Sequence, residues 1–199
     1  MINLLLFSGS QRRESFNARL LRYLAEHLKE RCIIDMIEPH QIDLPLFNQD
    51  LEDSPAVIER VIALHRRFNA SHGMIVASPE YNGQLTAHLK NIVDWASRLP
   101  HIDHRFENPF IDRPVLLCSA STGWSGGAVA LPQARALFGY VGGVVIGDSI
   151  CLPYADQAWT SEGYLFDPFF DQKIRAATDR VVRLAQAFAD SKIEQLETA

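Results

Sequence analysis

Short apolar runs alternate with helical patterns along the 199-residue chain. The first run, residues 2–7, is continuously hydrophobic, as expected of a strand buried on both faces of a parallel sheet. After a polar gap the period changes: Phe16, Leu20, Leu24 and Leu28 recur every four residues, which predicts an amphipathic helix. The expected strands are residues 2–7, 32–37, 74–77, 115–119 and 144–146, and the expected helices are residues 16–28, 55–69, 86–97, 128–138 and 171–195.

This strict alternation of strand and helix predicts an α/β fold with an open parallel sheet and helices on both faces. No internal repeat or linker divides the chain, so residues 1–199 are expected to form one domain. In such sheets ligands bind beyond the carboxyl ends of the strands, where the winding direction reverses. The loops after the first, third and fourth strands are therefore the expected places for a site.

Composition and charge are those of a globular protein, with 47% hydrophobic residues, 22% charged residues and a net charge of -5. The basic residues are scattered, which disfavours broad binding to nucleic acid or to anionic membranes. No apolar run is long enough to cross a bilayer, and the N-terminus shows no signal-peptide pattern. The three cysteines lie far apart without a CxxC pair, so a reducing, cytoplasmic environment is expected.

The loop after the first strand, "GSQRRES" (residues 9–15), leads directly into a helix. Free backbone N–H groups and the helix macrodipole favour an anion there. Hydroxyl groups of Ser10 and Ser15, the amide of Asn17 and one guanidinium would complete a phosphate site. The alternative is that Ser15 only caps the helix and the arginines lie on the surface. Neither GxGxxG nor GxxxxGK[ST] is present, which favours a terminal monophosphate over a pyrophosphate.

The loop after the third strand begins "SPEYNG". Pro79 stiffens the exit of the strand, and Asn82-Gly83 is a strong turn dipeptide. Glu80 and Tyr81 are thereby held at the carboxyl edge of the sheet. Such a turn can offer backbone groups to the edge of a planar heterocycle, although taken alone it is better interpreted as a plain turn before a helix.

The loop after the fourth strand, "SASTGWSGG", has glycines that permit close backbone approach and hydroxyls at Ser121 and Thr122. Trp124 could cover a ring or fill a surface gap. No serine stands in a GxSxG frame, which disfavours a hydrolase nucleophile. The histidines show no metal-ligand spacing, and His101 and His104 are interpreted as part of a polar loop, so no metal is assigned.

Together, the first two loops resemble the NADPH-dependent FMN reductase family, a branch of the flavodoxin-like fold that includes bacterial quinone, chromate and azo-dye reductases. The resemblance spans roughly residues 2–190 and implies a three-layer sandwich with strand order 2-1-3-4-5. The chain departs from the family pattern in the aromatic-rich stretch 152–171, which leaves the outer wall of the pocket undefined. The matching pieces are Gly9-Ser10-x-Arg12-x-x-Ser15-x-Asn17, Pro79-Glu80-Tyr81-Asn82-Gly83, Leu89-Lys90-Asn91 and Asp94-Trp95, with Ser121, Gly123, Gly126 and Gly127 in the third loop.

The resemblance implies FMN as the cofactor and NADPH or NADH as the co-substrate. It further implies a homodimer or homotetramer and a small-molecule electron acceptor: a quinone, a flavin, an azo compound or a metal oxyanion. No nucleic-acid or membrane partner is expected. The implied phosphate contacts are Ser10, Arg12, Ser15, Phe16 and Asn17; the flavin ring and ribityl chain would be lined by Pro79, Glu80, Tyr81, Asn82 and Gly83, and closed by Ser121 and Gly123.

The expected activity is an oxidoreductase that passes a hydride from NAD(P)H, through N5 of the flavin, to a quinone-like or other small acceptor. Because the flavin carries the chemistry, no side chain is assigned as catalytic. Three alternatives stay open. FMN could be a diffusing substrate that is released reduced to a partner, or the protein could be a flavodoxin-type electron shuttle, for which a net charge of -5 is weak. It could also be a module that has lost its cofactor.

Overall fold

The computed structural model describes residues 1–197 and contains a five-stranded parallel sheet in the order β2-β1-β3-β4-β5. The expected α/β fold and strand order are confirmed. The strands are β1 (Asn3–Ser8), β2 (Ile33–Ile37), β3 (Gly73–Ala77), β4 (Pro114–Ala120) and β5 (Val144–Leu152). The helices are α1 (Phe16–Leu28), α2 (Pro55–Asn69), α3 (Ala87–Ile102), α4 (Leu131–Tyr140) and α5 (Pro168–Glu197), with short 3-10 turns at Pro39–Gln41 and Gln49–Asp53.

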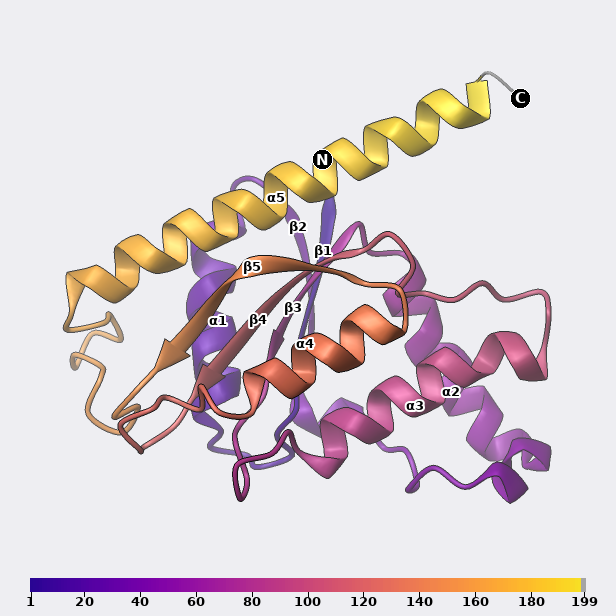
Figure 1. The fold of residues 1–199 in the computed structure, drawn as a ribbon, viewed down its shortest axis with the longest axis horizontal. Coiled ribbons are helices and arrows are strands. Elements are labelled where there is room, and N and C mark those ends of the chain that lie inside the picture. Colours follow the sequence, from indigo (N-terminus) through magenta and orange to yellow (C-terminus); the bar gives the residue numbers. More distant parts are fainter. Residues whose placement is uncertain (198–199) are drawn as a thin grey trace.

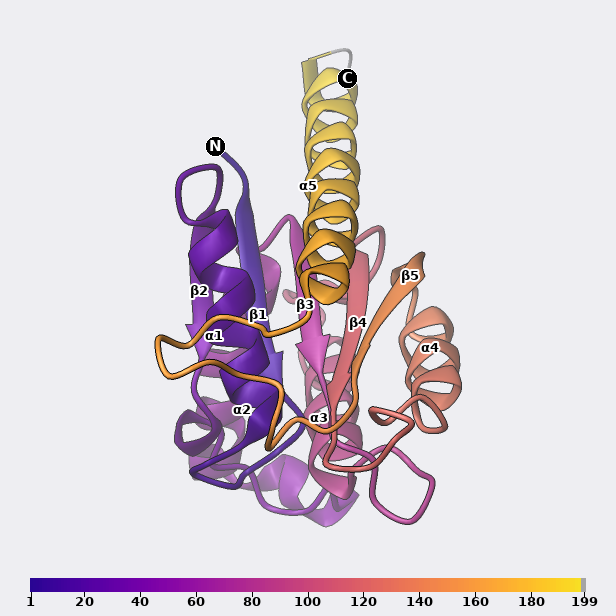
Figure 2. The same ribbon diagram turned by 90° about the vertical axis from the view of Figure 1, so that its left-hand side faces the viewer.

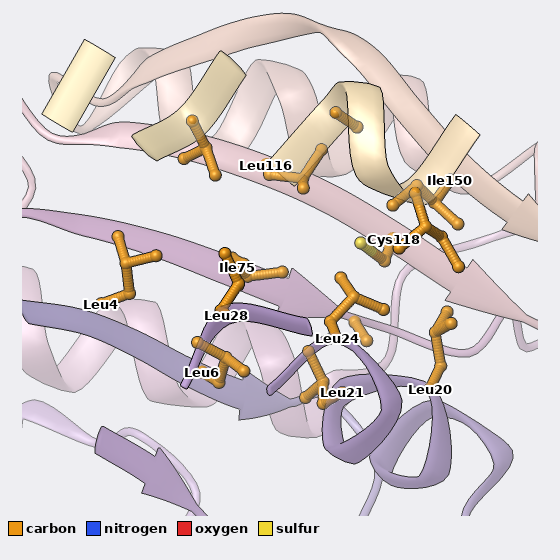
Figure 3. Packing of buried hydrophobic residues seen from close by; sticks show 14 of the residues in the cluster. Leu4, Leu6, Leu20, Leu21, Leu24, Leu28, Ile75, Leu116, Cys118 and Ile150 are labelled. Atoms are coloured by element: carbon orange, nitrogen blue, oxygen red, sulfur yellow. The ribbon is translucent and has the colours of Figure 1, made fainter. Parts of the chain in front are cut away.

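The helices form two layers around the sheet (Figures 1 and 2). Helices α1 and α5 cover one face, where their apolar side chains join one buried cluster with the central strands. Helices α2, α3 and α4 supply the buried cluster on the other face. Figure 3 shows part of the first cluster, to which α1 contributes Leu20, Leu24 and Leu28, β1 contributes Leu6 and β3 contributes Ile75. The central strands are buried on both faces, which is why their sequences read as continuous apolar runs.

Most element boundaries differ from the sequence prediction by no more than three residues, but helix α3 continues to Ile102 instead of ending at residue 97. Helix α4 begins at Leu131 instead of residue 128, because Gly126 and Gly127 hold positive φ values and the chain turns before Pro132 can start a helix. Strand β5 continues to Leu152 instead of ending at residue 146. A shift in its register with β4 between Val115 and Leu117 interrupts the apolar pattern that defines a strand in sequence.

The long helix α5 packs on the sheet through only part of its length. Ile174, Ala177, Val181 and Ala185 are buried, whereas Phe188 is half-buried. Beyond these residues the helix extends past the edge of the sheet (Figure 1). In the portion of the chain that the structure describes, no helix is long and apolar enough to cross a membrane.

His65 of α2 is 2% exposed and its Nε2–H donates to the carbonyl of Glu107 at 2.7 Å. Burial lowers the pKa of this imidazole below its usual value of about 6.5. The folded state therefore binds fewer protons here than the unfolded state, so the stabilisation is complete above about pH 6.5 and is lost as the pH falls through the folded pKa.

We expect the urea midpoint of unfolding to fall between about pH 7.5 and pH 5.5. A His65→Gln variant, which keeps a donor for Glu107 but cannot titrate, should lose less stability over the same interval. An equal or larger loss in the variant would show that this ring does not govern the acid sensitivity.

Candidate functional site

Three loops meet at the carboxyl edge of the sheet, which lies at the bottom of Figure 2. They follow β1, β3 and β4 and are named loop 1 (residues 9–15), loop 2 (residues 78–86) and loop 3 (residues 121–130). The strand order reverses between β1 and β3, so loops 1 and 2 flank the switch point at which such sheets bind ligands. The structure therefore brings together all three loops that the sequence analysis singled out.

Loop 1 starts at Gly9, a position where there is no room for a side chain. A Cβ atom at Gly9 would lie 2.7 Å from the hydroxyl of Ser78 and 3.0 Å from Cβ of Leu89. The N–H of Gly9 donates to the carbonyl of Ala77 at 2.9 Å, and its own carbonyl accepts from the hydroxyl of Thr86 at 2.6 Å. Loop 1 is thus fixed against the first turn of α3 as it leaves the sheet.

The hydroxyl groups of Ser10 and Ser15 are buried, each residue being 3% exposed. The Ser10 oxygen accepts from the backbone N–H of Arg12 at 3.2 Å, and the Ser15 oxygen accepts from the N–H of Ala18 at 3.3 Å. Ser15 therefore does cap α1, as the simpler interpretation held. Capping uses only the oxygen as acceptor, so each hydroxyl keeps its own hydrogen for donation to a ligand.

The start of α1 is electropositive. Its first turn carries no acidic residue, and within residues 1–197 the backbone N–H groups of Phe16 and Asn17 have no acceptor. Arg12 and Arg13 are exposed, and in the described chain neither forms an ion pair with a carboxylate. The guanidinium of Arg12 lies 5.0 Å from the ring of Phe16, a cation–π contact that keeps it near the helix start.

The side chain of Asn17 has a structural role that the sequence did not predict. Its side-chain amide donates to the carbonyl of Ala120 at 2.9 Å and its side-chain oxygen accepts from the N–H of Ala120 at 2.9 Å. Asn17 is 2% exposed and Ala120 is also 2% exposed, so both bonds are shielded from water. This pair joins the start of α1 to the end of β4. The side chain of Asn17 thus positions loop 1, while its backbone N–H remains available to an anion.

Replacing Asn17 by alanine leaves both backbone groups of Ala120 buried without a partner. We expect a loss of about 2–4 kcal/mol in the free energy of unfolding, measured by urea denaturation. Asn69→Ala, at the exposed end of α2, is the matched control and should change stability by less than about 0.5 kcal/mol. A loss at Asn17 no larger than the control's would contradict the assigned role.

Loop 2 contains a tight two-residue turn. Tyr81 and Gln84 exchange backbone hydrogen bonds of 3.0 Å in both directions, and Asn82 and Gly83 between them have φ values of 54° and 72°. Two successive positive φ values are those of a type I′ turn, which the Asn-Gly dipeptide favours. The turn holds Tyr81 at the edge with its side chain 54% exposed.

Loops 2 and 3 are joined by Glu80, whose carboxylate accepts from the backbone N–H groups of Val129 at 2.9 Å and Ala130 at 3.1 Å. A negative charge just ahead of α4 is also favoured by the helix dipole. Gln133 of α4 adds a bond to the carbonyl of Gly83 at 3.0 Å and accepts from the N–H of Leu85 at 3.3 Å. The carboxylate of Glu80 is therefore committed to structure, and only its backbone remains for a ligand.

Loop 3 runs close to the backbone at the end of β5. A Cβ atom at Gly126 would lie 2.8 Å from backbone atoms of Cys151 and Leu152, and Gly126 and Gly127 have positive φ values of 61° and 85°. The N–H of Ser121 donates to the carbonyl of Leu152 at 3.1 Å, and the Ser121 hydroxyl oxygen accepts from the N–H of Gly123 at 3.1 Å. These contacts fix the turn at Ser121 and Gly123 beside loop 2.

The stretch after β5, named the crossing segment (residues 153–167), passes in front of α1 (Figure 2). The ring of Trp159 lies 4.4 Å from the guanidinium of Arg19 and packs edge-on against Tyr23. The hydroxyl of Tyr23 donates to the carboxylate of Asp171 at 2.7 Å. Burial, reinforced by this bond, raises the pKa of Tyr23 to about 12. The segment is therefore anchored to α1 at one end of the site.

The predicted site residues lie together at the sheet edge, but their side chains do different work. Ser10, Ser15 and Arg12 retain donors for a ligand. The side chains of Asn17 and Glu80 instead form hydrogen bonds with neighbouring backbone groups. The sequence analysis missed three residues that hold the loops in place: Ser78, Thr86 and Gln133. Only Thr86 left a signal, since a threonine directly before an amphipathic run is a typical N-cap.

The parallel sheet, its strand order and the loops at its carboxyl edge define a flavodoxin-like α/β protein. The model of the NADPH-dependent FMN reductase family matches residues 2–157, and the chain belongs to that family. It is accordingly a flavin-dependent oxidoreductase that uses FMN with NAD(P)H as co-substrate.

Three relatives show the level of similarity. A quinone reductase of Escherichia coli is 30% identical over 138 residues, which cover 69% of this chain and 70% of the relative. An NAD(P)H-dependent FMN reductase of Pseudomonas aeruginosa is 29% identical over 169 residues, covering 83% of this chain and 85% of the relative. The solved structure of FerB, a flavoenzyme NAD(P)H:(acceptor) oxidoreductase from Paracoccus denitrificans, has a TM-score of 0.81 at 25% identity, covering 94% of this chain and 99% of FerB.

Proposed function

We propose that loop 1 binds the FMN phosphate and that the protein reduces a quinone-like acceptor at the expense of NAD(P)H. The observation that carries the proposal is the set of unused donors at the start of α1. These donors lie around the N-terminus of α1. They are the buried hydroxyls of Ser10 and Ser15, the backbone N–H groups of Phe16 and Asn17, and the unpaired guanidinium of Arg12. Such a set is matched to a terminal phosphate and has little use in folding alone.

The same donors fit a mononucleotide better than a dinucleotide. Loop 1 contains one glycine, so it lacks the glycine-rich backbone along which a pyrophosphate is usually bound. Beyond the phosphate, the flavin ring would lie between loops 2 and 3. In the described chain the backbone N–H groups of Glu80, Asn82 and Gly83 have no acceptor, so they are the donors offered to the ring edge. Ser121 and Gly123 would close the far side.

FMN bound by these loops would supply the redox chemistry that couples the oxidation of NAD(P)H to the reduction of the acceptor. The residues of the chain bind and orient. Loop 1 fixes the phosphate end, the type I′ turn of loop 2 fixes one edge of the ring, and the bonds from Glu80 and Gln133 keep loops 2 and 3 at a constant separation. No side chain of the site is assigned a proton-transfer role.

The proposal extends to the surroundings of the site. We treat residues 1–199 as one FMN-binding domain, because α5, beyond the family match, packs on the same sheet as α1. A homodimer or homotetramer in the cytoplasm remains the expected form. The free cysteines are consistent with a reducing compartment, since burial raises the pKa of the Cys32 and Cys118 thiols and keeps them unreactive.

A Ser10→Ala, Arg12→Ala double variant should bind FMN at least about 100-fold more weakly, because two charge-assisted hydrogen bonds to the phosphate are lost. The protein should then purify largely colourless, and its NADPH oxidation with an added quinone should require excess FMN. Flavin content is measured from the visible absorption of dialysed protein. Ser191→Ala with Arg66→Ala, both on exposed helix surfaces, is the matched control and should remain yellow. Full FMN content in the double variant would refute the phosphate assignment.

A further inference from the structure

Two exposed aromatic side chains border loop 3. Trp124 is 79% exposed and Tyr154 is 53% exposed. The backbone N–H of Tyr154 reaches the carbonyl of Gly123 at 3.4 Å, which places it beside the residue that precedes Trp124. Within the described residues neither ring is stacked on another aromatic side chain. Both ring faces are therefore available at the outer edge of the proposed flavin site.

Tyr154 is held in an unfavourable backbone conformation. Its φ is 47°, in the left-handed region that suits glycine or asparagine and that is an outlier for a bulky residue. Neighbouring bonds maintain it: the N–H of Ala155 donates to Ser121 at 3.0 Å and the N–H of Gln157 donates to the carbonyl of Tyr154 at 2.8 Å. Asparagine would fit this backbone better, so the presence of a tyrosine points to a use for its ring.

The segments that carry the two rings are acidic. Loop 3 and the crossing segment contain no lysine, arginine or histidine, and the crossing segment carries Asp156, Glu162 and Asp167. The cations near them come from other elements: Arg19 of α1 is stacked on the ring of Trp159, and Lys173 of α5 acts on Cys151 at the end of β5. An anionic acceptor would be repelled by the carboxylates of the crossing segment. A neutral planar ring would find two aromatic faces.

We propose that Trp124 and Tyr154 contact the electron acceptor at the outer edge of the site and select it; we call these two side chains the rim. The preferred acceptors are then neutral planar aromatic molecules, so quinones are preferred over metal oxyanions. The inference rests on the proposed function, since it requires FMN beside loop 3. In the overall reaction NAD(P)H is oxidised to NAD(P)⁺, and the quinone takes up the two electrons with one proton from the coenzyme and one from solvent to give the hydroquinone. The rim acts on acceptor binding, upstream of the electron transfer.

The test compares Tyr154→Asn, which keeps the left-handed backbone and removes the ring, with Tyr154→Phe, which keeps the ring. Trp124→Ala removes the second ring. Tyr140→Asn is the matched control, because Tyr140 is 92% exposed at the end of α4 and lies outside loop 3 and the crossing segment. Each FMN-loaded protein is titrated with 2-naphthol, a planar aromatic that is not reduced, and binding is followed by the perturbation of the visible flavin band.

Tyr154→Asn and Trp124→Ala should each raise the Kd for 2-naphthol by about 5- to 10-fold, and the KM for a naphthoquinone by the same factor. Tyr154→Phe should raise either constant by less than about 2-fold, because the ring is kept. In these two ring-deletion variants the ratio of quinone KM to ferricyanide KM should also rise. Ferricyanide is an anion without a planar ring, so its KM should not depend on the two aromatic side chains. If Tyr154→Asn and Trp124→Ala match Tyr140→Asn in every readout while all retain the flavin band, the rim is refuted and the proposed function stands. If the unmodified protein retains no flavin band after mixing with FMN and removal of unbound FMN by gel filtration, both the proposed function and the rim fail.

Discussion

The structure of the site depends on the buried pair of hydrogen bonds between the side chain of Asn17 and the backbone of Ala120. These bonds fix the N-terminus of α1 at the end of β4, across the central strands of the sheet. A helix N-terminus attracts anions only where its N–H groups face an open space, and this contact fixes where that space lies. The proposed phosphate site and the proposed ring site are thereby held in a fixed position relative to each other.

The polar residues of the three loops divide into two groups with different tasks. Asn17, Glu80, Thr86 and Gln133 satisfy backbone groups of neighbouring loops and have little left for a ligand. Within residues 1–197, the backbone N–H groups of Phe16, Asn17, Asn82 and Gly83 have no acceptor, and they lie at the same edge of the sheet. The residues that join the loops hold the remaining donors in position before FMN binds. Binding FMN therefore need not order the loops, and more of the interaction energy contributes to affinity.

The sequence predicted the elements whose pattern is local and missed features that depend on distant contacts. The run before loop 1, the repeat of leucines in α1 and the proline at the start of α2 were sufficient to locate β1, α1 and α2. The start of α4 was placed too early because the chain first turns at Gly126 and Gly127, and the carboxylate that holds the end of this turn belongs to Glu80, about 50 residues away in the chain. Likewise the positions of Ser10 and Ser15 could be read from the sequence, but the bonds of Asn17 to a residue 103 positions away could not.

The most direct test of the account is the affinity for FMN compared with that for riboflavin, which differs only in lacking the phosphate. Titration of flavin-free protein, followed by quenching of flavin fluorescence, gives both dissociation constants under the same conditions. If loop 1 is a phosphate site, FMN should bind at least about 100-fold more tightly than riboflavin, and high salt should narrow the difference. Equal affinity for the two flavins would contradict the account.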